Sequence, residues 1–355
     1  MNLEQLGFSE RISTLANEQK IDPSSIARVS AEHRERYTLL SETGEYEAEI
    51  TGNMRYTSTS RSDFPAVGDW VQYIPYDDEH AIIQAVLPRL SSITRQAVGQ
   101  FGEIQIIASN IDKAFIVQAL DRDFSINRLE RYLTICYSSG VAPVIVLSKT
   151  DLVDPETIKE YTKELDKRTR DVPVILLSNI EGKGIEEVRS HLGTGVSCCV
   201  MGSSGVGKST LINNLAGRAL METGEISSAT NRGRHVTSHR QMFILNDGGI
   251  LIDTPGMREL GIADSGEGLD KTYDPIVELA SGCRYVDCTH TTESGCAVIE
   301  AVETGELDAS SYENYLKLIR EQAFFQSTLE ERRKKDKEFG KMVKGYKNLK
   351  KKQRD

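Results

Sequence analysis

The chain has 355 residues, 39% of them hydrophobic and 27% charged, which is typical of a soluble protein with two or three domains. No segment approaches the ~18 consecutive apolar residues of a membrane span, and the N-terminus has no export signal. We therefore expect a cytoplasmic monomer with no membrane partner, whose six cysteines serve as buried thiols or metal ligands rather than disulfides.

The net charge of −10 is spread unevenly along the chain. Residues 331–355 contain twelve Lys or Arg and four acids, a local charge of +8, so the rest of the chain carries −18. This asymmetry predicts a basic interaction tail on an acidic body, although a solvated terminal helix would have the same composition.

The first third of the chain predicts an N-terminal extension, residues 1–34, followed by an all-β domain, residues 35–105. The segments RYTLLS, YEAEI, GDWVQYI and AIIQAVL read as short strands separated by turns, with no helical period among them. Several short strands favour a small barrel or sandwich, of which the five-stranded OB barrel is one economical choice. Such barrels often bind RNA, but this pattern is equally typical of a structural module.

Residues 106–265 alternate between apolar strands and amphipathic helices, which predicts an α/β domain with a mostly parallel sheet. Residues 266–330 are polar and predict a mainly helical domain. There, Ser310 to Glu313 have the spacing of a capping box for a final helix.

The α/β part contains GSSGVGKS, which fits the phosphate-binding pattern G-x-x-x-x-G-K-[ST] and lies between an apolar strand and a helix. Glycines there let backbone N–H groups surround phosphates, Lys208 would reach the β- and γ-phosphates, and Ser209 would coordinate Mg²⁺. The predicted phosphate-binding residues are Gly202, Ser203, Ser204, Gly205, Val206, Gly207, Lys208, Ser209 and Thr210.

Two later segments predict the nucleotide-state switches. Asp253 ends the apolar strand GILID and can hold Mg²⁺ through water, while Gly256 can place its N–H against the γ-phosphate. In the polar segment before that strand, Thr237 is the candidate second hydroxyl ligand of Mg²⁺.

The base-recognition residues are predicted upstream of the phosphate loop. Asp151 can accept hydrogen bonds from N1–H and the 2-amino group of guanine, and Lys149 can lie over the base. Ser148 occupies the position where the usual guanine motif has Asn, so we expect guanine selectivity with weaker binding. Ser178 and Asn179 suit the last base-contacting loop.

In an ordinary GTPase the phosphate loop precedes both switches and the base motif, whereas here the base motif comes first. This order predicts a circularly permuted domain, which a parallel sheet tolerates because each loop keeps its place at the strand tips. The segment after Asp253 then leads directly into the C-terminal helical domain.

A cluster of Cys283, Cys288, His290 and Cys296 supplies four soft or borderline ligands within a short segment. Four such ligands complete a tetrahedral shell, so we expect one structural Zn²⁺ with no open catalytic position.

These features together resemble one family, the circularly permuted, small-subunit-dependent GTPases known as RsgA, YjeQ or YloQ. The resemblance rests on FPAVGDWV, NIDKAFIV, GRHVT, the permuted motifs and the Cys-x4-Cys-x-His-x5-Cys signature, and spans roughly residues 35–330. It implies an OB barrel, a permuted GTPase domain and a zinc domain. It also implies a role in late maturation of the small ribosomal subunit, with contacts to its rRNA and hydrolysis stimulated by that subunit.

The residue that orients the attacking water cannot be assigned by the usual rule. The position after Gly256, a glutamine in Ras-like enzymes, is Met257, so we expect slow intrinsic hydrolysis. His235 is our candidate for orienting water, although it could merely contact RNA. Two other readings stay open: a different P-loop NTPase, and a nucleotide-regulated RNA-binding scaffold with little turnover.

Overall fold

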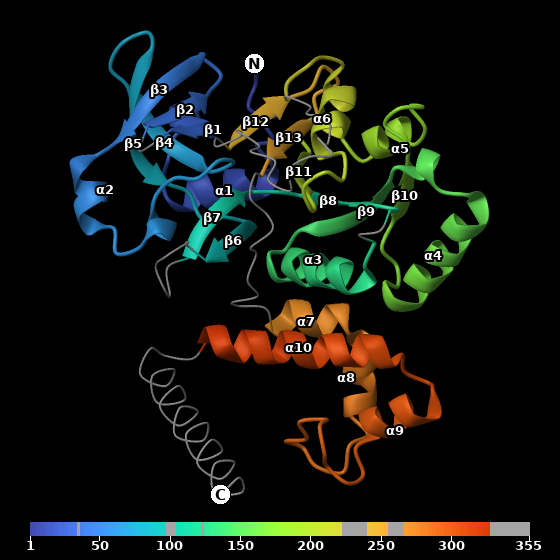
Figure 1. Cartoon of the computed structure of the whole chain (residues 1–355). Helices are drawn as coiled ribbons and strands as arrows, with labels where there is room; N and C mark the ends of the chain where they lie inside the picture. The colour runs from blue at the N-terminus through green and yellow to red at the C-terminus, as the bar shows by residue number, and fades with distance from the viewer. Residues whose placement is uncertain (34–35, 97–103, 122–123, 222–239, 255–265, 327–355) are drawn as a thin grey trace, which may run out of the picture.

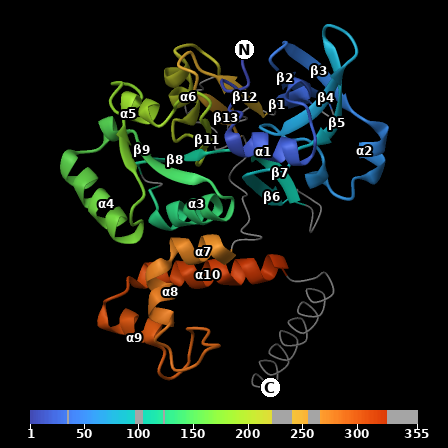
Figure 2. The ribbon, with the colours of Figure 1, turned by 180° about the vertical axis from the view of Figure 1, so that it is seen from behind.

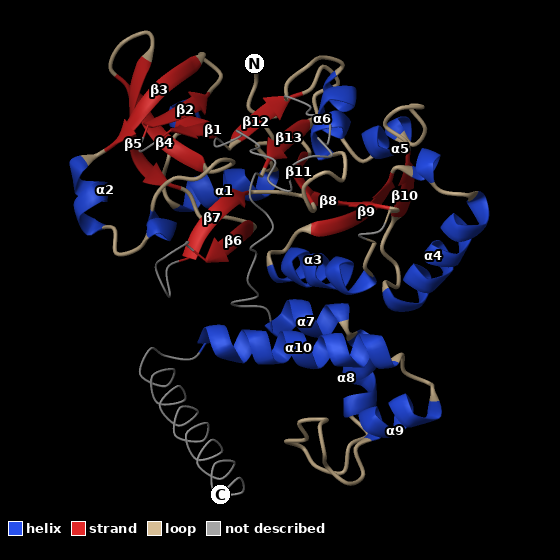
Figure 3. Cartoon of the chain, in the orientation of Figure 1, coloured by secondary structure: helices blue, strands red, loops and turns tan. Residues whose placement is uncertain are grey.

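The computed structural model describes residues 1–33, 36–96, 104–121, 124–221, 240–254 and 266–326. In Figure 1 a β-barrel and an α/β domain lie side by side, and a helical block lies beneath the α/β domain. Figure 3 shows that the strands belong to the first two parts, whereas the described part of the third contains only helices and loops.

Five strands form the N-terminal barrel, in the order β1-β2-β3-β5-β4, and a β1–β4 pairing closes it. Strand β3 shows the alternation that builds it: Tyr46, Ala48 and Ile50 are buried while the glutamates between them are exposed. The predicted barrel is confirmed. Its strands are β1 Ile26–His33, β2 Arg36–Leu40, β3 Glu45–Ile50, β4 Trp70–Pro75 and β5 His80–Val86.

The residues before the barrel pack onto it. Helix α1 (Glu10–Glu18) buries Ile12 and Ala16 in a cluster with Trp70 of β4. Strand β1 begins before residue 35, where the sequence placed the start of the barrel domain. Short helical segments fill the remaining connections: η1 Pro23–Ser25, α2 Gly52–Thr57 and η2 Arg61–Asp63.

Arg28 joins the barrel to its neighbours. It is 1% exposed and donates hydrogen bonds to the carbonyls of Leu6, Gly68 and Asn110, at 2.5, 3.3 and 2.9 Å. Burial lowers the pKa of Arg28 to about 10, so the guanidinium is still charged at neutral pH. One buried cation therefore fixes the N-terminal segment, the barrel and the start of the α/β domain to one another.

The α/β domain has a mostly parallel sheet in the order β10-β9-β8-β11-β13-β12, with only β12 antiparallel. Apolar residues of α3 and α4 cover one face, and those of α5 and α6 cover the other. The elements are β8 Lys113–Ala119, α3 Ile126–Ser138, β9 Ala142–Ser148, η3 Thr150–Leu152, α4 Pro155–Arg168, β10 Val174–Leu177, α5 Ile185–Ser190, β11 Ser197–Met201, α6 Lys208–Ala216, β12 Gln241–Ile244 and β13 Ile250–Asp253.

The barrel and the α/β domain share one continuous sheet, because β12 pairs with β1 at Ala31 and Gln241. Arg240 strengthens this junction: its Nη1 lies 3.3 Å from Glu32 Oε2 and 3.1 Å from the Ile106 carbonyl. A separate hairpin of β6 (Ser92–Gln96) and β7 (Ile104–Ser109), which we did not predict, lies between the two domains in the chain.

The C-terminal block consists of α7 Gly266–Thr272, α8 Asp274–Ala280, α9 Ala297–Thr304 and α10 Ala309–Gln326. Helices α7 and α10 lie beneath α3, as the two opposite views in Figures 1 and 2 agree. The predicted capping box is wrong, because α10 begins before Ser310 and the Asp308 carboxylate accepts from the Ser311 N–H at 2.8 Å. Among the described helices, none has the length and apolar character needed to cross a bilayer.

Candidate nucleotide site and metal centre

The phosphate loop joins β11 to α6, and two of its glycines have positive φ angles and close neighbours that disfavour a side chain. A Cβ on Gly202 (φ +142°) would lie 2.2 Å from the Val117 carbonyl oxygen, and one on Gly207 (φ +93°) would lie 2.9 Å from Asn179 Nδ2. Helix α6 starts at Lys208 directly after the loop, so its first N–H groups face the same space. The loop thus has the geometry of an anion-binding cradle.

Lys208 lies across this cradle. Its Nζ donates to the carbonyl of Gly202 at 2.9 Å and also to that of Ser203. Asp253, at the end of β13, is 8% exposed. Burial raises the pKa of Asp253 above its ordinary value, against the opposing effect of the nearby Lys208 ammonium. The Lys208 ammonium is therefore near enough to the Asp253 carboxylate to affect its pKa.

The residues expected to recognise the base form a second hydrogen-bonded group. Lys149 has a left-handed backbone (φ +62°) that turns the chain after β9 into η3, which carries Asp151. Ser178 donates from Oγ to Asp151 Oδ1 at 2.7 Å and accepts from the Glu181 N–H at 3.1 Å. Lys149 Nζ pairs with Asp121 Oδ2 at 2.8 Å, so its side chain is held in place.

Two contacts join the base group to the phosphate loop. Asn179, the neighbour of Ser178, donates from Nδ2 to the Gly207 carbonyl at 3.2 Å, and Asn214 of α6 donates to Asn179. Ser148, at the end of β9, donates from Oγ to the Val206 carbonyl at 2.7 Å. Segments that are predicted to contact opposite ends of a nucleotide thus meet at one edge of the sheet, although the base segments come first in the chain.

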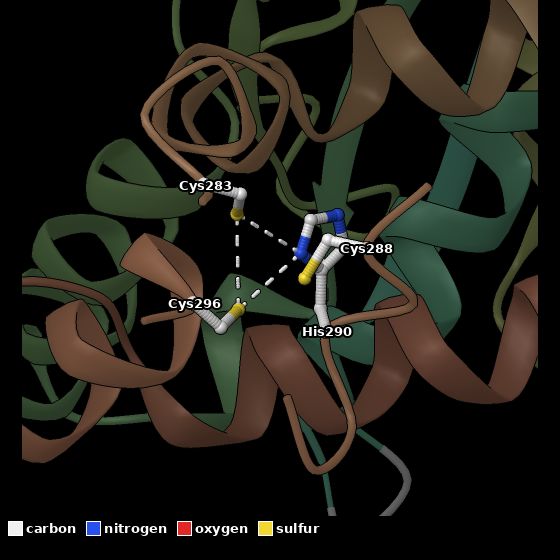
Figure 4. A group of neighbouring side chains, drawn as sticks. All are labelled: Cys283, Cys288, His290 and Cys296. Atoms are coloured by element: carbon white, nitrogen blue, oxygen red, sulfur yellow. Dashed lines mark hydrogen bonds between the residues drawn. The ribbon is translucent and has the colours of Figure 1, made fainter. Parts of the chain in front are cut away.

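The second candidate site is a cluster of four potential metal ligands, and Figure 4 shows their side chains turned toward one another. The ligand atoms of Cys283, Cys288, His290 and Cys296 all lie within 4.8 Å of one another. Cys283 Sγ is 3.8 Å from Cys296 Sγ, and His290 Nδ1 is 3.5 Å from Cys283 Sγ and 3.4 Å from Cys296 Sγ.

These separations fit a tetrahedral Zn²⁺ site. Bonds of about 2.3 Å to sulfur and 2.0–2.1 Å to nitrogen at tetrahedral angles place two sulfurs about 3.8 Å apart and sulfur and nitrogen about 3.6 Å apart. The surroundings support the ligands: the Ile299 N–H, in the first turn of α9, donates to Cys296 Sγ at 3.5 Å, and Tyr312 donates to the His290 carbonyl. The cluster therefore holds α9, α10 and the ligand loop together.

Comparison with known proteins identifies the family. The model of the family described as RsgA GTPase matches residues 86–263. The protein named small ribosomal subunit biogenesis GTPase RsgA 1 from Bacteroides thetaiotaomicron is 39% identical over 351 residues, which is 98% of each chain. The chain belongs to the RsgA GTPase family.

Other members of the RsgA family and two solved structures agree. RsgA 2 from Listeria monocytogenes is 42% identical over 325 residues, 91% of this chain and 90% of its own. The crystal structure of YjeQ from Thermotoga maritima has a TM-score of 0.63 at 27% identity, covering 84% of this chain and 98% of that one. YloQ, described as a circularly permuted GTPase, has a TM-score of 0.61 at 22% identity, which bears on the fold alone.

In this RsgA family member, Ser148 makes a contact with the phosphate loop that the sequence did not predict. A serine has fewer hydrogen-bonding groups than the usual Asn, and its buried hydroxyl donates to the Val206 carbonyl of the phosphate loop. The sequence also gave no sign that Arg128, Asp121 and Asn214 contact the site residues. Thr237, His235 and Gly256 lie outside the described residues.

Replacement of Ser148 by Ala is expected to weaken both the fold and the nucleotide site. The Val206 carbonyl loses its hydroxyl donor, which should lower the free energy of unfolding by about 1–3 kcal/mol and lower the affinity for GDP. Denaturant unfolding and fluorescent-GDP titration would measure both. Ser190→Ala, at an exposed hydroxyl on α5, is the control, and equal values for the two variants would contradict a tether at Ser148.

Proposed function

We propose that the protein is a GTPase that acts in biogenesis of the small ribosomal subunit, as its RsgA relatives are named to do. The observation that carries the proposal is the pairing of Ser178 with Asp151 and of Asn179 with Gly207. These adjacent residues place a carboxylate suited to guanine beside a loop suited to phosphates. The zinc-type cluster and the barrel provide two further parts that a partner could contact.

In the proposed mechanism each residue has one task. Asp151 accepts from guanine, the N–H groups of the loop and Lys208 bind the phosphate oxygens, and Ser209 supplies a ligand for the Mg²⁺ that accompanies GTP. Asp253 lies where it can orient water bound to that ion. Thr237 and Gly256 are proposed to respond to the γ-phosphate, and His235 to orient the attacking water.

The metal site is proposed to hold one structural Zn²⁺ through Cys283, Cys288, His290 Nδ1 and Cys296. The ion would stabilise the helical domain, and its full tetrahedral shell leaves it no role in hydrolysis.

The proposal is tested by measuring hydrolysis of GTP and ATP with and without purified small ribosomal subunits. We expect slow hydrolysis of GTP alone, strong stimulation by the subunit, and no comparable turnover of ATP. Equal use of ATP would indicate a different P-loop NTPase. Binding of GTP without stimulated turnover would indicate a nucleotide-regulated RNA-binding scaffold.

Asp151→Asn is expected to change the preferred base from guanine to xanthine. Asn keeps one acceptor oxygen, but its NH2 group faces the 2-amino group of guanine, so one hydrogen bond to a carboxylate, worth about 1.5–3 kcal/mol, is lost and affinity for GTP should fall by at least about 10- to 10²-fold. Xanthine carries a carbonyl in place of the 2-amino group, which the Asn amide can satisfy, so affinity for XTP should rise. Competition titrations with GTP and XTP measure the change, and an unaltered preference would remove Asp151 from base recognition.

Truncation of the chain at residue 330 is expected to weaken binding to the small ribosomal subunit while leaving affinity for GTP unchanged. The removed segment contains twelve Lys or Arg. For each lost contact with a phosphate of single-stranded RNA, the slope of log K against log salt should become shallower by about 0.7. Binding measured over a series of salt concentrations gives this slope, and an unchanged slope would exclude the tail as a phosphate contact.

A further inference from the structure

Helix α3 touches the phosphate loop at its first turn. Arg128 donates from Nη1 to Ser203 Oγ at 3.3 Å. The Ser203 carbonyl meanwhile accepts from Lys208 Nζ. Ser203 is therefore contacted by two cations: Lys208 binds its carbonyl oxygen and Arg128 binds its hydroxyl.

Next to that turn, the same helix enters a buried polar network with the helical domain. Glu130 is 1% exposed and pairs with Arg168 of α4 at 2.7 Å. Tyr273, from the segment before α8, donates to Glu130 Oε2 at 3.0 Å, and Asn314 of α10 donates to the same atom at 2.7 Å. A buried carboxylate is stable only with its partners in place, so this network fixes α10 against α3.

Further along, α3 remains in close contact with the helical domain. Arg131 forms a two-bond ion pair with Glu321 of α10. Thr134 donates to Thr272 Oγ1 of α7 at 3.0 Å. A Cβ on Gly268 of α7 would lie 2.0 Å from Ser138 Oγ, so α7 and α3 are packed with no room for a larger residue.

We propose that Arg128 is a positioning residue for the phosphate loop, and that α3 couples nucleotide occupancy of the loop to the packing of the helical domain. The inference rests on the proposed nucleotide site. When phosphates occupy the loop, Lys208 leaves the Ser203 carbonyl and Arg128 remains as the contact on that residue. Any shift of Ser203 is then carried by one rigid helix to Glu130 and Arg131.

The test compares hydrogen exchange of the wild-type chain with and without saturating GDP. We expect GDP to protect residues 202–209 and also to change exchange rates in α10 by about 2- to 30-fold. In Arg128→Ala, and equally in Ser203→Ala, the change in α10 should disappear while the loop is still protected. The double variant should lose no more than either single one, and Arg128→Lys should restore part of the response.

Saturating GDP separates loss of coupling from loss of affinity, and melting curves confirm that each variant is folded. Arg218→Ala, which removes an exposed arginine of the same domain, is the matched control and should respond as the wild type does. An unchanged α10 response in both Arg128→Ala and Ser203→Ala would overturn the inference. Protection of the wild-type loop with no change in α10 would also overturn it. No protection of the loop at all would instead overturn the nucleotide site, and the inference with it.

Discussion

Replacement of Lys208 by Ala is expected to lower kcat for subunit-stimulated GTP hydrolysis by about 10²- to 10³-fold, the usual cost of removing one preorganised group that stabilises transition-state charge. Lys208 Nζ lies over the phosphate loop, held by the carbonyls of Gly202 and Ser203. Because the lysine contacts are made by the loop itself, the ammonium is already at the site before phosphates enter. Phosphate release under saturating GTP measures the effect.

Saturating GTP is needed because the same substitution should weaken binding. Lys208→Arg keeps the charge on a longer, forked group and should restore part of the affinity but less of the rate, since the arginine cannot occupy the same point. Lys163→Ala, at an exposed position on α4, should behave as the wild type. If Lys208→Ala keeps the wild-type kcat, the phosphate loop is not the site of hydrolysis.

The sequence was sufficient to predict those features whose residues lie close together along the chain. Continuous apolar runs such as KAFIVQA and APVIVLS predict central strands of a parallel sheet, which are buried on both faces. The structure confirms them as β8 and β9. The four metal ligands also lie close in sequence, and their side chains do converge.

The long-range contacts could not be predicted in this way. Nothing near Arg28 in the sequence indicates that its partners are the carbonyls of Leu6, Gly68 and Asn110. The pairing of β12 with β1 depends on the way two domains meet, and a strand pattern leaves open which edge a neighbour will use. The tether at Ser148 was missed for a similar reason, because its acceptor lies 58 residues away.

Replacement of Cys296 by Ser is expected to abolish stable zinc binding and to unfold part of the helical domain at a lower temperature than in the wild type. Cys296 is 4% exposed and its Sγ contacts both Cys283 and His290. It is also the N-cap residue of α9, and because Ser is itself a favoured N-cap residue, the substitution removes a metal ligand while leaving the helix a cap. Binding of structural Zn²⁺ contributes about 10–16 kcal/mol to the folding of small zinc-finger peptides. Loss of even a small part of that free energy would lower the melting temperature of the helical domain.

Metal analysis of the purified variant and its melting curve measure the two effects. Zinc should fall from about one ion per chain to a small fraction of that. Cys136→Ala is the control, because that buried thiol contacts Met201 within the α/β domain and should cost some stability without any loss of zinc. A Cys296→Ser variant that keeps a full zinc content would show that the ion is held elsewhere. A zinc-free variant with an unchanged melting curve would show that the metal does not stabilise this domain.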